Sequence, residues 1–150
     1  MTERSSAAAF DRETLEFLER PLLMRLATIG ADGYPQVTPV WFLQEGGRLW
    51  TSTEKGRVKV RNMLRDARVG ASIDDDAQPY RGISVKGLAA MHEPGSSPID
   101  VRTMVRRIAA RYTPAHEVDD MVDWLFQGPR VLIEIEPVNV AKIGSGWSRI

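Results

Sequence analysis

A short basic segment holds the residues whose types and spacing are best suited to chemistry. Residues 54–68 contain six Lys or Arg and two acidic residues, a net charge of +4, in a chain of zero net charge. Ser52 and Thr53 precede this segment, where a predicted strand ends and a helix begins. Hydroxyls, free N–H groups at a helix start and guanidinium groups together bind anions such as phosphate. The sequence therefore predicts a phosphate site here, with a solvated basic helix face as the alternative interpretation.

Side chains that catalyse reactions by themselves are scarce in the rest of the sequence. The chain has no cysteine, which excludes disulfides, thiolate metal sites and cysteine nucleophiles. It has no Gly-x-Ser-x-Gly, P-loop or Rossmann glycine pattern. We expect His92 and His116 to lie on the surface and residues 74–76, all Asp, to form a solvated turn. Any chemistry is therefore expected from a cofactor; no catalytic side chain is assigned, and Tyr80 and solvent are the candidate proton donors.

An apolar stretch lies upstream of the basic segment. Pro35 and Pro39 cannot donate to a strand ladder, so the strand that contains them is at a sheet edge or is interrupted. Such a strand can offer backbone groups to the hydrogen-bonding edge of a flat heterocycle. The alternative is that Trp41 and Phe42 are core or interface aromatics, and the alternation of side chains along a strand favours this for at least one of them.

The elements that must position these residues follow from turn signals and hydrophobic spacing. Asp11 is expected to cap a helix over 12–20, and Val60, Met63 and Leu64 to form the packing face of a second helix. Short turns without regular strand–helix alternation indicate an α+β class, with a mostly antiparallel sheet that closes into a barrel. The pattern predicts strands over 22–29, 34–43, 48–53, 69–73, 80–91, 131–135 and 138–143, and helices over 12–20, 55–66, 101–112 and 118–126.

The length fits one domain. We expect residues 1–9 to be a mobile N-terminal tail and residues 10–150 to form a single domain. No apolar run approaches the roughly 18 residues of a membrane span, and the N-terminus lacks a signal-peptide core. We therefore expect a cytoplasmic protein that does not bind membranes. Zero net charge also argues against nucleic-acid binding, although a stripe of Arg57, Arg61 and Arg65 leaves it as a third functional alternative.

The order and spacing of these motifs resemble the pyridoxamine 5'-phosphate oxidase-like family of flavin-binding split β-barrels. The resemblance covers roughly residues 12–90 and extends more weakly to 129–138. It implies a six-stranded split barrel that works as a homodimer, with FMN or the deazaflavin coenzyme F420 at the dimer interface. The basic segment is most similar to the deazaflavin-dependent branch, so F420 is the preferred cofactor. The residues that carry the resemblance are ATIGADGYPQVTPVWF (27–42), TST (51–53) and GRVKVRNMLRDARV (56–69).

The resemblance also implies the residues that bind the cofactor. Two cations hold its phosphate, a strand end supports that phosphate, a second strand lies along the ring through backbone groups, and one aromatic residue reaches the ring from the other subunit. In that order these are Arg57 and Lys59; Thr51, Ser52 and Thr53; Val37, Thr38, Pro39 and Val40; and Trp147.

The function implied is that of an oxidoreductase acting on a small or medium conjugated organic substrate. The cofactor ring carries the hydride, and the protein orients the ring and excludes water. The Arg- and His-rich C-terminal segment of true pyridoxamine phosphate oxidases is missing, as is the C-terminal histidine loop of a haem-degrading branch. Neither vitamin B6 oxidation nor haem degradation is therefore expected. The alternative is a non-catalytic F420 or FMN carrier or sensor, which the scarcity of acid–base residues supports.

Overall fold

The computed structural model describes residues 10–149, so the predicted tail over residues 1–9 lies outside the described residues. The α+β class is confirmed. No helix of residues 10–149 is both long enough and apolar enough to cross a membrane. In chain order the elements are α1 (Arg12–Phe17), β1 (Met24–Ile29), β2 (Pro35–Val40), β3 (Leu43–Glu45), β4 (Arg48–Glu54), α2 (Val58–Arg65), β5 (Arg68–Asp75), β6 (Arg81–His92), α3 (Val101–Ala110), the 3₁₀ turn η2 (Ala115–Glu117), α4 (Val118–Leu125) and β7 (Arg130–Ile143).

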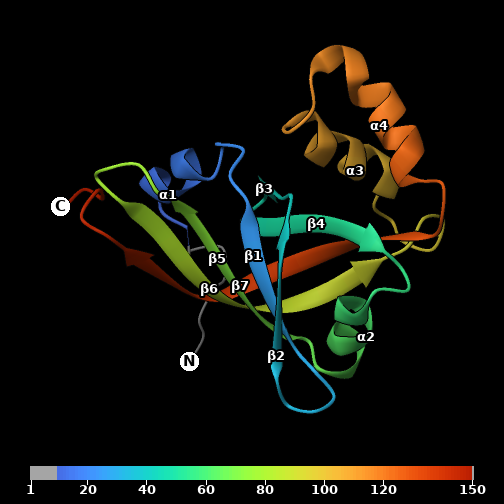
Figure 1. Ribbon diagram of the computed structural model, residues 1–150, viewed down its shortest axis with the longest axis horizontal. Helices are drawn as coiled ribbons and strands as arrows, with labels where there is room; N and C mark the ends of the chain where they lie inside the picture. The colour runs from blue at the N-terminus through green and yellow to red at the C-terminus, as the bar shows by residue number, and fades with distance from the viewer. Residues whose placement is uncertain (1–9, 150) are drawn as a thin grey trace.

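The strands form one curled, antiparallel seven-stranded sheet (Figure 1). Their order is β2-β1-β5-β6-β7-β4-β3, so β2 and β3 are consecutive in the chain but lie at opposite edges. The curl brings the β2 edge close enough to β4 for both to line the same pockets, although the two strands are not hydrogen-bonded neighbours. The predicted split barrel is therefore confirmed. The strands expected over 131–135 and 138–143 are one continuous strand, β7.

The strand predicted over 34–43 is two strands in the structure, which raises the count above the expected six. The break lies at Trp41 and Phe42. Thr51 Oγ1 donates a hydrogen bond to the carbonyl of Trp41 at 2.6 Å, and the N–H of Phe42 donates to Tyr112 Oη at 3.2 Å. Because side chains from distant elements satisfy the backbone groups at this corner, the chain can leave one sheet edge and join the other.

The turns that join the strands have the backbone that their glycines predict. Gly33 has a φ of 85°, and Gly46 and Gly47 have φ values of 63° and 78°. Two successive positive φ values are typical of a type I′ hairpin turn, whose twist matches that of the flanking strands. This turn joins β3 to β4 at one edge of the sheet.

Helix α2 packs on β1. Val60 and Met63 are buried as predicted, but Leu64 is 72% exposed, so the prediction that Leu64 belongs to the packing face is wrong. The buried neighbour is instead Asn62, whose Nδ2 donates to Thr28 Oγ1 at 3.0 Å. An amide with a hydrogen-bond partner can occupy a buried position, and this contact fixes α2 against the strand that pairs with β2.

Helices α3 and α4 form a pair that stands over one end of the sheet, while α1 and the C-terminus lie at the other end (Figure 1). Val105 and Ile108 of α3 pack with Trp50 and Leu132 of the sheet. Arg111, just after α3, donates to the carbonyls of Phe42, Leu18 and Arg20 and so anchors the pair to the chain corner between β2 and β3. Two ion pairs join α3 to α4, Arg102–Asp123 at 2.8 Å and Arg106–Asp119 at 2.6 Å.

Candidate functional site

Two adjacent pockets lie in the gap between β2 and β4. The first, called the cationic pocket, has a cavity of about 370 Å³ and is lined by β2, the end of β4, the start of α2 and two residues from later in the chain. Its size falls within the range of small-molecule sites. The residues important to its chemistry are Thr38, Ser52, Thr53, Arg57, Lys59 and Arg130.

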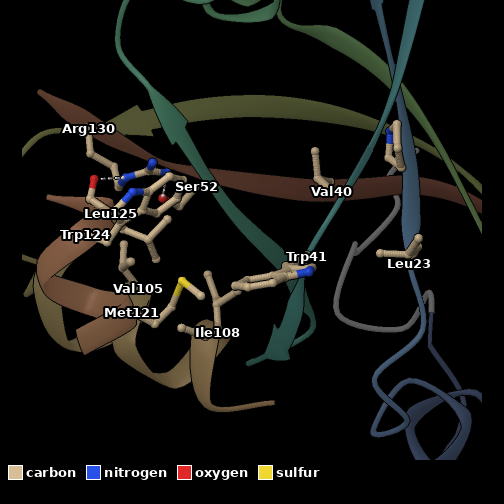
Figure 2. Close-up of a pocket in the computed structure, with 12 residues that line it drawn as sticks. Leu23, Val40, Trp41, Ser52, Val105, Ile108, Met121, Trp124, Leu125 and Arg130 are labelled. Carbon is tan, nitrogen blue, oxygen red and sulfur yellow. Dashed lines mark hydrogen bonds between the residues drawn. The ribbon is translucent and has the colours of Figure 1, made fainter. Parts of the chain in front are cut away.

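The second, called the apolar pocket, lies between β2, β4 and the α3–α4 pair (Figure 2). Its cavity is about 470 Å³. Aliphatic side chains from the helices face Val40 and Trp41 across it (Figure 2). This pocket resembles ligand sites in general, which are mostly apolar with a few placed polar groups.

Ser52, Trp124 and Arg130 line both pockets. Arg130 Nε donates to the carbonyl of Leu125 at 2.8 Å, and its Nη1 donates to Ser52 Oγ at 2.9 Å (Figure 2). Trp124, on α4, leaves 62% of its surface exposed. Because these residues are common to both pockets, the pockets form one groove, polar toward α2 and apolar beneath α3 and α4.

The cationic pocket holds a charge that lacks a counter-ion. Burial lowers the pKa of Lys59 below its ordinary 10.5, and the neighbouring Arg57 cation lowers it further. Among residues 10–149, no carboxylate pairs with Lys59, whereas Arg57 pairs with the exposed Glu54. The first turn of α2 has neither a side-chain cap nor an acidic residue, so it leaves N–H donors free. This donor set fits a phosphate, which would stabilise the charged form of Lys59.

Most of the predicted site residues line these two pockets. β2 is an edge strand, as Pro35 and Pro39 predict. The side chains of β2 alternate, and the half-buried ones face the groove. The predicted residues that line the groove are Thr38, Pro39, Val40, Ser52, Thr53, Arg57 and Lys59.

Three of the predicted site residues line neither pocket. Val37 is 59% exposed, because alternate residues of β2 face opposite sides. Thr51 is buried, and its hydroxyl bonds the corner at Trp41 instead of facing either pocket. Trp147 is also buried and lies elsewhere in the fold.

Trp147 lies in the core of its own chain, in the same cluster as Phe17 of α1. Its ring packs edge-on against Phe17 with centroids 5.1 Å apart. Its Nε1 donates to the carbonyls of Ile143 at 3.0 Å and Gly82 at 3.2 Å. These contacts account for the side chain within one subunit and give no support to the expected contact with a partner's cofactor.

Sequence reasoning missed Arg130 and Trp124. Arg130 reaches the groove because β7 pairs with β4 in a register that places it opposite Glu54, and no local pattern predicts so distant a pairing. Trp124 falls outside the apolar spacing of α4, in which Val118 and Val122 are buried. A single exposed aromatic residue is common on protein surfaces, so the sequence alone does not mark it.

The titratable side chains considered for catalysis lie outside both pockets. His92 is half-buried and not on the surface as expected; its Nδ1 lies 2.8 Å from Ser97 Oγ and its Nε2 lies 2.9 Å from Glu134 Oε1. Tyr80 Oη donates to Asp74 at 3.0 Å, and this bond raises the pKa of Tyr80. In the part of the chain that the structure describes, no group of His, Cys, Asp and Glu could hold a metal ion.

Comparisons with known proteins agree on one fold. A family model described as pyridoxamine 5'-phosphate oxidase matches residues 10–144. A conserved hypothetical protein from Mycobacterium tuberculosis is 26% identical, with 96% of this chain and 90% of that chain covered and a TM-score of 0.72. An F420 reductase is 28% identical over 94% of this chain and 98% of that chain, with a TM-score of 0.59. The haem storage protein HutZ from Vibrio cholerae, at 18% identity over 93% of this chain and 96% of that chain and a TM-score of 0.67, shares the fold. No curated protein matches the sequence.

Proposed function

Because the chain belongs to the pyridoxamine 5'-phosphate oxidase family, whose model spans residues 10–144, we propose that it is an oxidoreductase that binds a flavin-type cofactor between β2 and β4. F420 is the preferred cofactor and FMN the alternative. The proposal rests on the groove, which offers cations for a phosphate in the cationic pocket and, beside them, the free edge of β2 for a flat ring. The likeness to an F420 reductase supports the choice of F420.

In this proposal Arg57 and Lys59 hold the cofactor phosphate. The hydroxyls of Ser52 and Thr53 and the N–H groups at the start of α2 are further donors. The ring lies along residues 38–40, on the outer edge of β2, which has no strand partner within residues 10–149. Backbone groups there are free to bond a heterocycle. When bound and reduced, the cofactor supplies a hydride to a conjugated organic substrate.

A non-catalytic carrier of the same cofactor is the second candidate. Glu54 is the one carboxylate among the described residues that line either pocket, and it pairs with Arg57. No histidine lines the groove formed by these residues. A groove without a free carboxylate or histidine suits a carrier, and in an oxidoreductase it favours solvent as the source of the proton.

We also propose that the protein is a homodimer. The outer face of the sheet has an apolar hollow of about 500 Å³, whose lining includes Leu88 and Val138, each 43% exposed. Ala27 also lines it and pairs directly with the exposed Val37 of β2. Exposed apolar surface of this kind marks an interface. A native mass near twice 16.8 kDa is expected, and a monomer in solution would contradict the proposal.

Titration of the full chain with F420 and with FMN, followed by absorbance, tests the cofactor assignment. Arg57→Ala and Lys59→Ala should each weaken binding by about 1.5–3 kcal/mol, the contribution of a hydrogen bond to a charged group. Arg61→Ala is the matched control, because it removes the same charge from α2 outside the cationic pocket, where Arg61 donates to the carbonyl of Gly56. Unchanged affinity in both site variants would overturn the assignment.

Turnover separates the two candidate functions. Reduced cofactor and protein are mixed with a panel of enones, quinones and nitroaromatics, and oxidation of the cofactor is followed by absorbance. Protein-dependent turnover supports an oxidoreductase. Tight cofactor binding without turnover across the panel supports the carrier.

A further inference from the structure

The apolar pocket extends away from the cationic pocket, beneath α3 and α4. Ile108 and Met121 contribute its helical wall, and Val40 and Trp41 its opposite wall (Figure 2). The ring of Trp41 stacks on Tyr112, with centroids 5.0 Å apart and planes within 2°. A wall held by such stacking keeps one orientation, so the pocket presents a fixed flat surface.

Arg130 alone is charged among the described residues that line this pocket. Its Nε and Nη1 donate to the carbonyl of Leu125 and to Ser52 Oγ, which fix the plane of the guanidinium. Within residues 10–149 no carboxylate forms an ion pair with Arg130. Burial is the main cause that lowers its pKa, while the nearby Glu54 carboxylate raises it and the Arg57 cation lowers it. A half-buried cation whose hydrogen-bond partners are both neutral is stabilised further by an anion.

We propose that the apolar pocket binds a flat, largely apolar organic acid, with its ring system between Trp41 and the α3–α4 pair and its anionic oxygens on Arg130. The identification of this acid as the substrate rests on the proposed function, whereas its binding does not. Trp124 is exposed and lines both pockets, so it lies between the bound acid and the cofactor site.

Two probes of the same shape and different charge test the role of Arg130. They are 2-naphthoate and 2-naphthamide, whose affinities for the full chain are measured by equilibrium dialysis. The naphthoate should bind about tenfold more tightly, the factor expected for one charge-assisted hydrogen bond. Arg130→Gln should remove this preference and leave naphthamide binding unchanged. Arg106→Gln removes the same charge from the surface of α3, where Arg106 pairs with Asp119, and should preserve the preference.

A second pair of variants tests the location. Met121→Trp fills the space between α4 and Trp41 and should weaken both probes by about tenfold or more, while Met121→Leu, which nearly conserves the side-chain volume, should leave both affinities unchanged. Equal affinity of the two probes for the native protein would overturn the proposal. Unchanged binding to a folded Met121→Trp variant would do so as well.

Cofactor affinity, measured on the same variants, separates this proposal from the proposed function. Met121→Trp should bind F420 or FMN as the native protein does. If Arg130→Gln weakens the cofactor as much as Arg57→Ala does and the naphthoate preference persists, Arg130 belongs to the phosphate site and the proposal is wrong. Normal cofactor binding without probe binding overturns the acid site alone. Probe binding without cofactor binding supports the acid site and overturns the proposed function alone.

Discussion

Both ends of the sheet hold cationic side chains, but those at one end have partners within the chain and two of those at the other end have no carboxylate partner. The end near α1 and the C-terminus, here called the closed end, holds several cations, and two of them, Arg81 and Lys142, lie over the ring of the buried Trp147. Each has a partner within the chain. The contacts are Arg20–Asp75, Arg25–Asp74 at 2.7 Å, Lys142–Asp11 at 2.6 Å, and Arg81 at 4.9 Å from the Phe17 ring and 5.3 Å from the Trp147 ring.

At the groove end, two of the cations lack a counter-ion. Lys59 and Arg130 are partly buried and have no carboxylate partner among the described residues. Arg57 has one, but both members of that pair are exposed, and such pairs contribute little to stability. The number of cations does not distinguish the two ends of the sheet. The presence or absence of a partner for each cation does. Charges that are buried and unpaired are typical of a functional site, and paired ones of a structural site.

The largest effect, a loss of folding stability, is expected from a substitution at the closed end. Trp147→Ala removes an aromatic core residue with two hydrogen bonds and should lower the free energy of unfolding by about 3–5 kcal/mol. Cofactor affinity of the folded variant should not change, because Trp147 lines neither pocket. Urea denaturation measures the first quantity and absorbance titration the second. A clear loss of affinity in folded Trp147→Ala would break the comparison and restore the contact with a partner's cofactor that the sequence suggested.

The groove end should show the opposite behaviour. Lys59→Met should lower cofactor affinity by about 1.5–3 kcal/mol. Its stability should be unchanged or higher, because the variant removes a desolvated charge that Arg57 repels. Lys142→Met at the closed end is the matched control; it should lose stability through its pairs with Asp11 and Glu13 and keep its cofactor affinity. Equal stability losses in the two variants would contradict the distinction.

The features that the sequence predicts correctly are those that depend on residues close together in the chain. The basic segment, the proline-marked edge strand and the glycine turns each depend on neighbouring residues, and all three were placed correctly. The chain corner at Trp41 and Phe42 was missed, because Thr51 and Tyr112 stabilise it from other elements. Arg130 was missed for the same reason, since the pairing of β7 with β4 brings it to the groove.

A smaller effect is expected at Asp11, which both caps α1 and pairs with Lys142. Asp11→Ala should lower stability by about 1 kcal/mol, a typical value for a lost helix cap. The bond from Lys142, followed by that from Thr14, lowers the pKa of Asp11 from 3.8 to about 2. Because the folded-state pKa is depressed, the contribution is present above pH 3.8 and is lost as the pH falls toward 2.

Thermal unfolding of the native protein and Asp11→Ala across this acid range is the measurement. The difference in Tm should narrow as the pH falls. Asp76→Ala, an exposed position that follows β5, should show little difference at any pH. A constant difference for Asp11→Ala would mean that the carboxylate charge does not support the closed end.

The smallest effect should appear in the pH dependence of cofactor binding at the groove end. Burial and Arg57 lower the pKa of Lys59 below 10.5 in the free protein, whereas a bound phosphate favours its charged form and raises the pKa again. Affinity should therefore be complete while Lys59 is protonated and should fall as the pH rises through the lowered pKa, with a proton taken up on binding in that range. Lys59→Arg keeps the charge at every pH of the titration and should flatten the profile. If the native protein and Lys59→Arg lose affinity in parallel, the cation of Lys59 does not hold the phosphate, and the groove end then relies on Arg57 and on the start of α2.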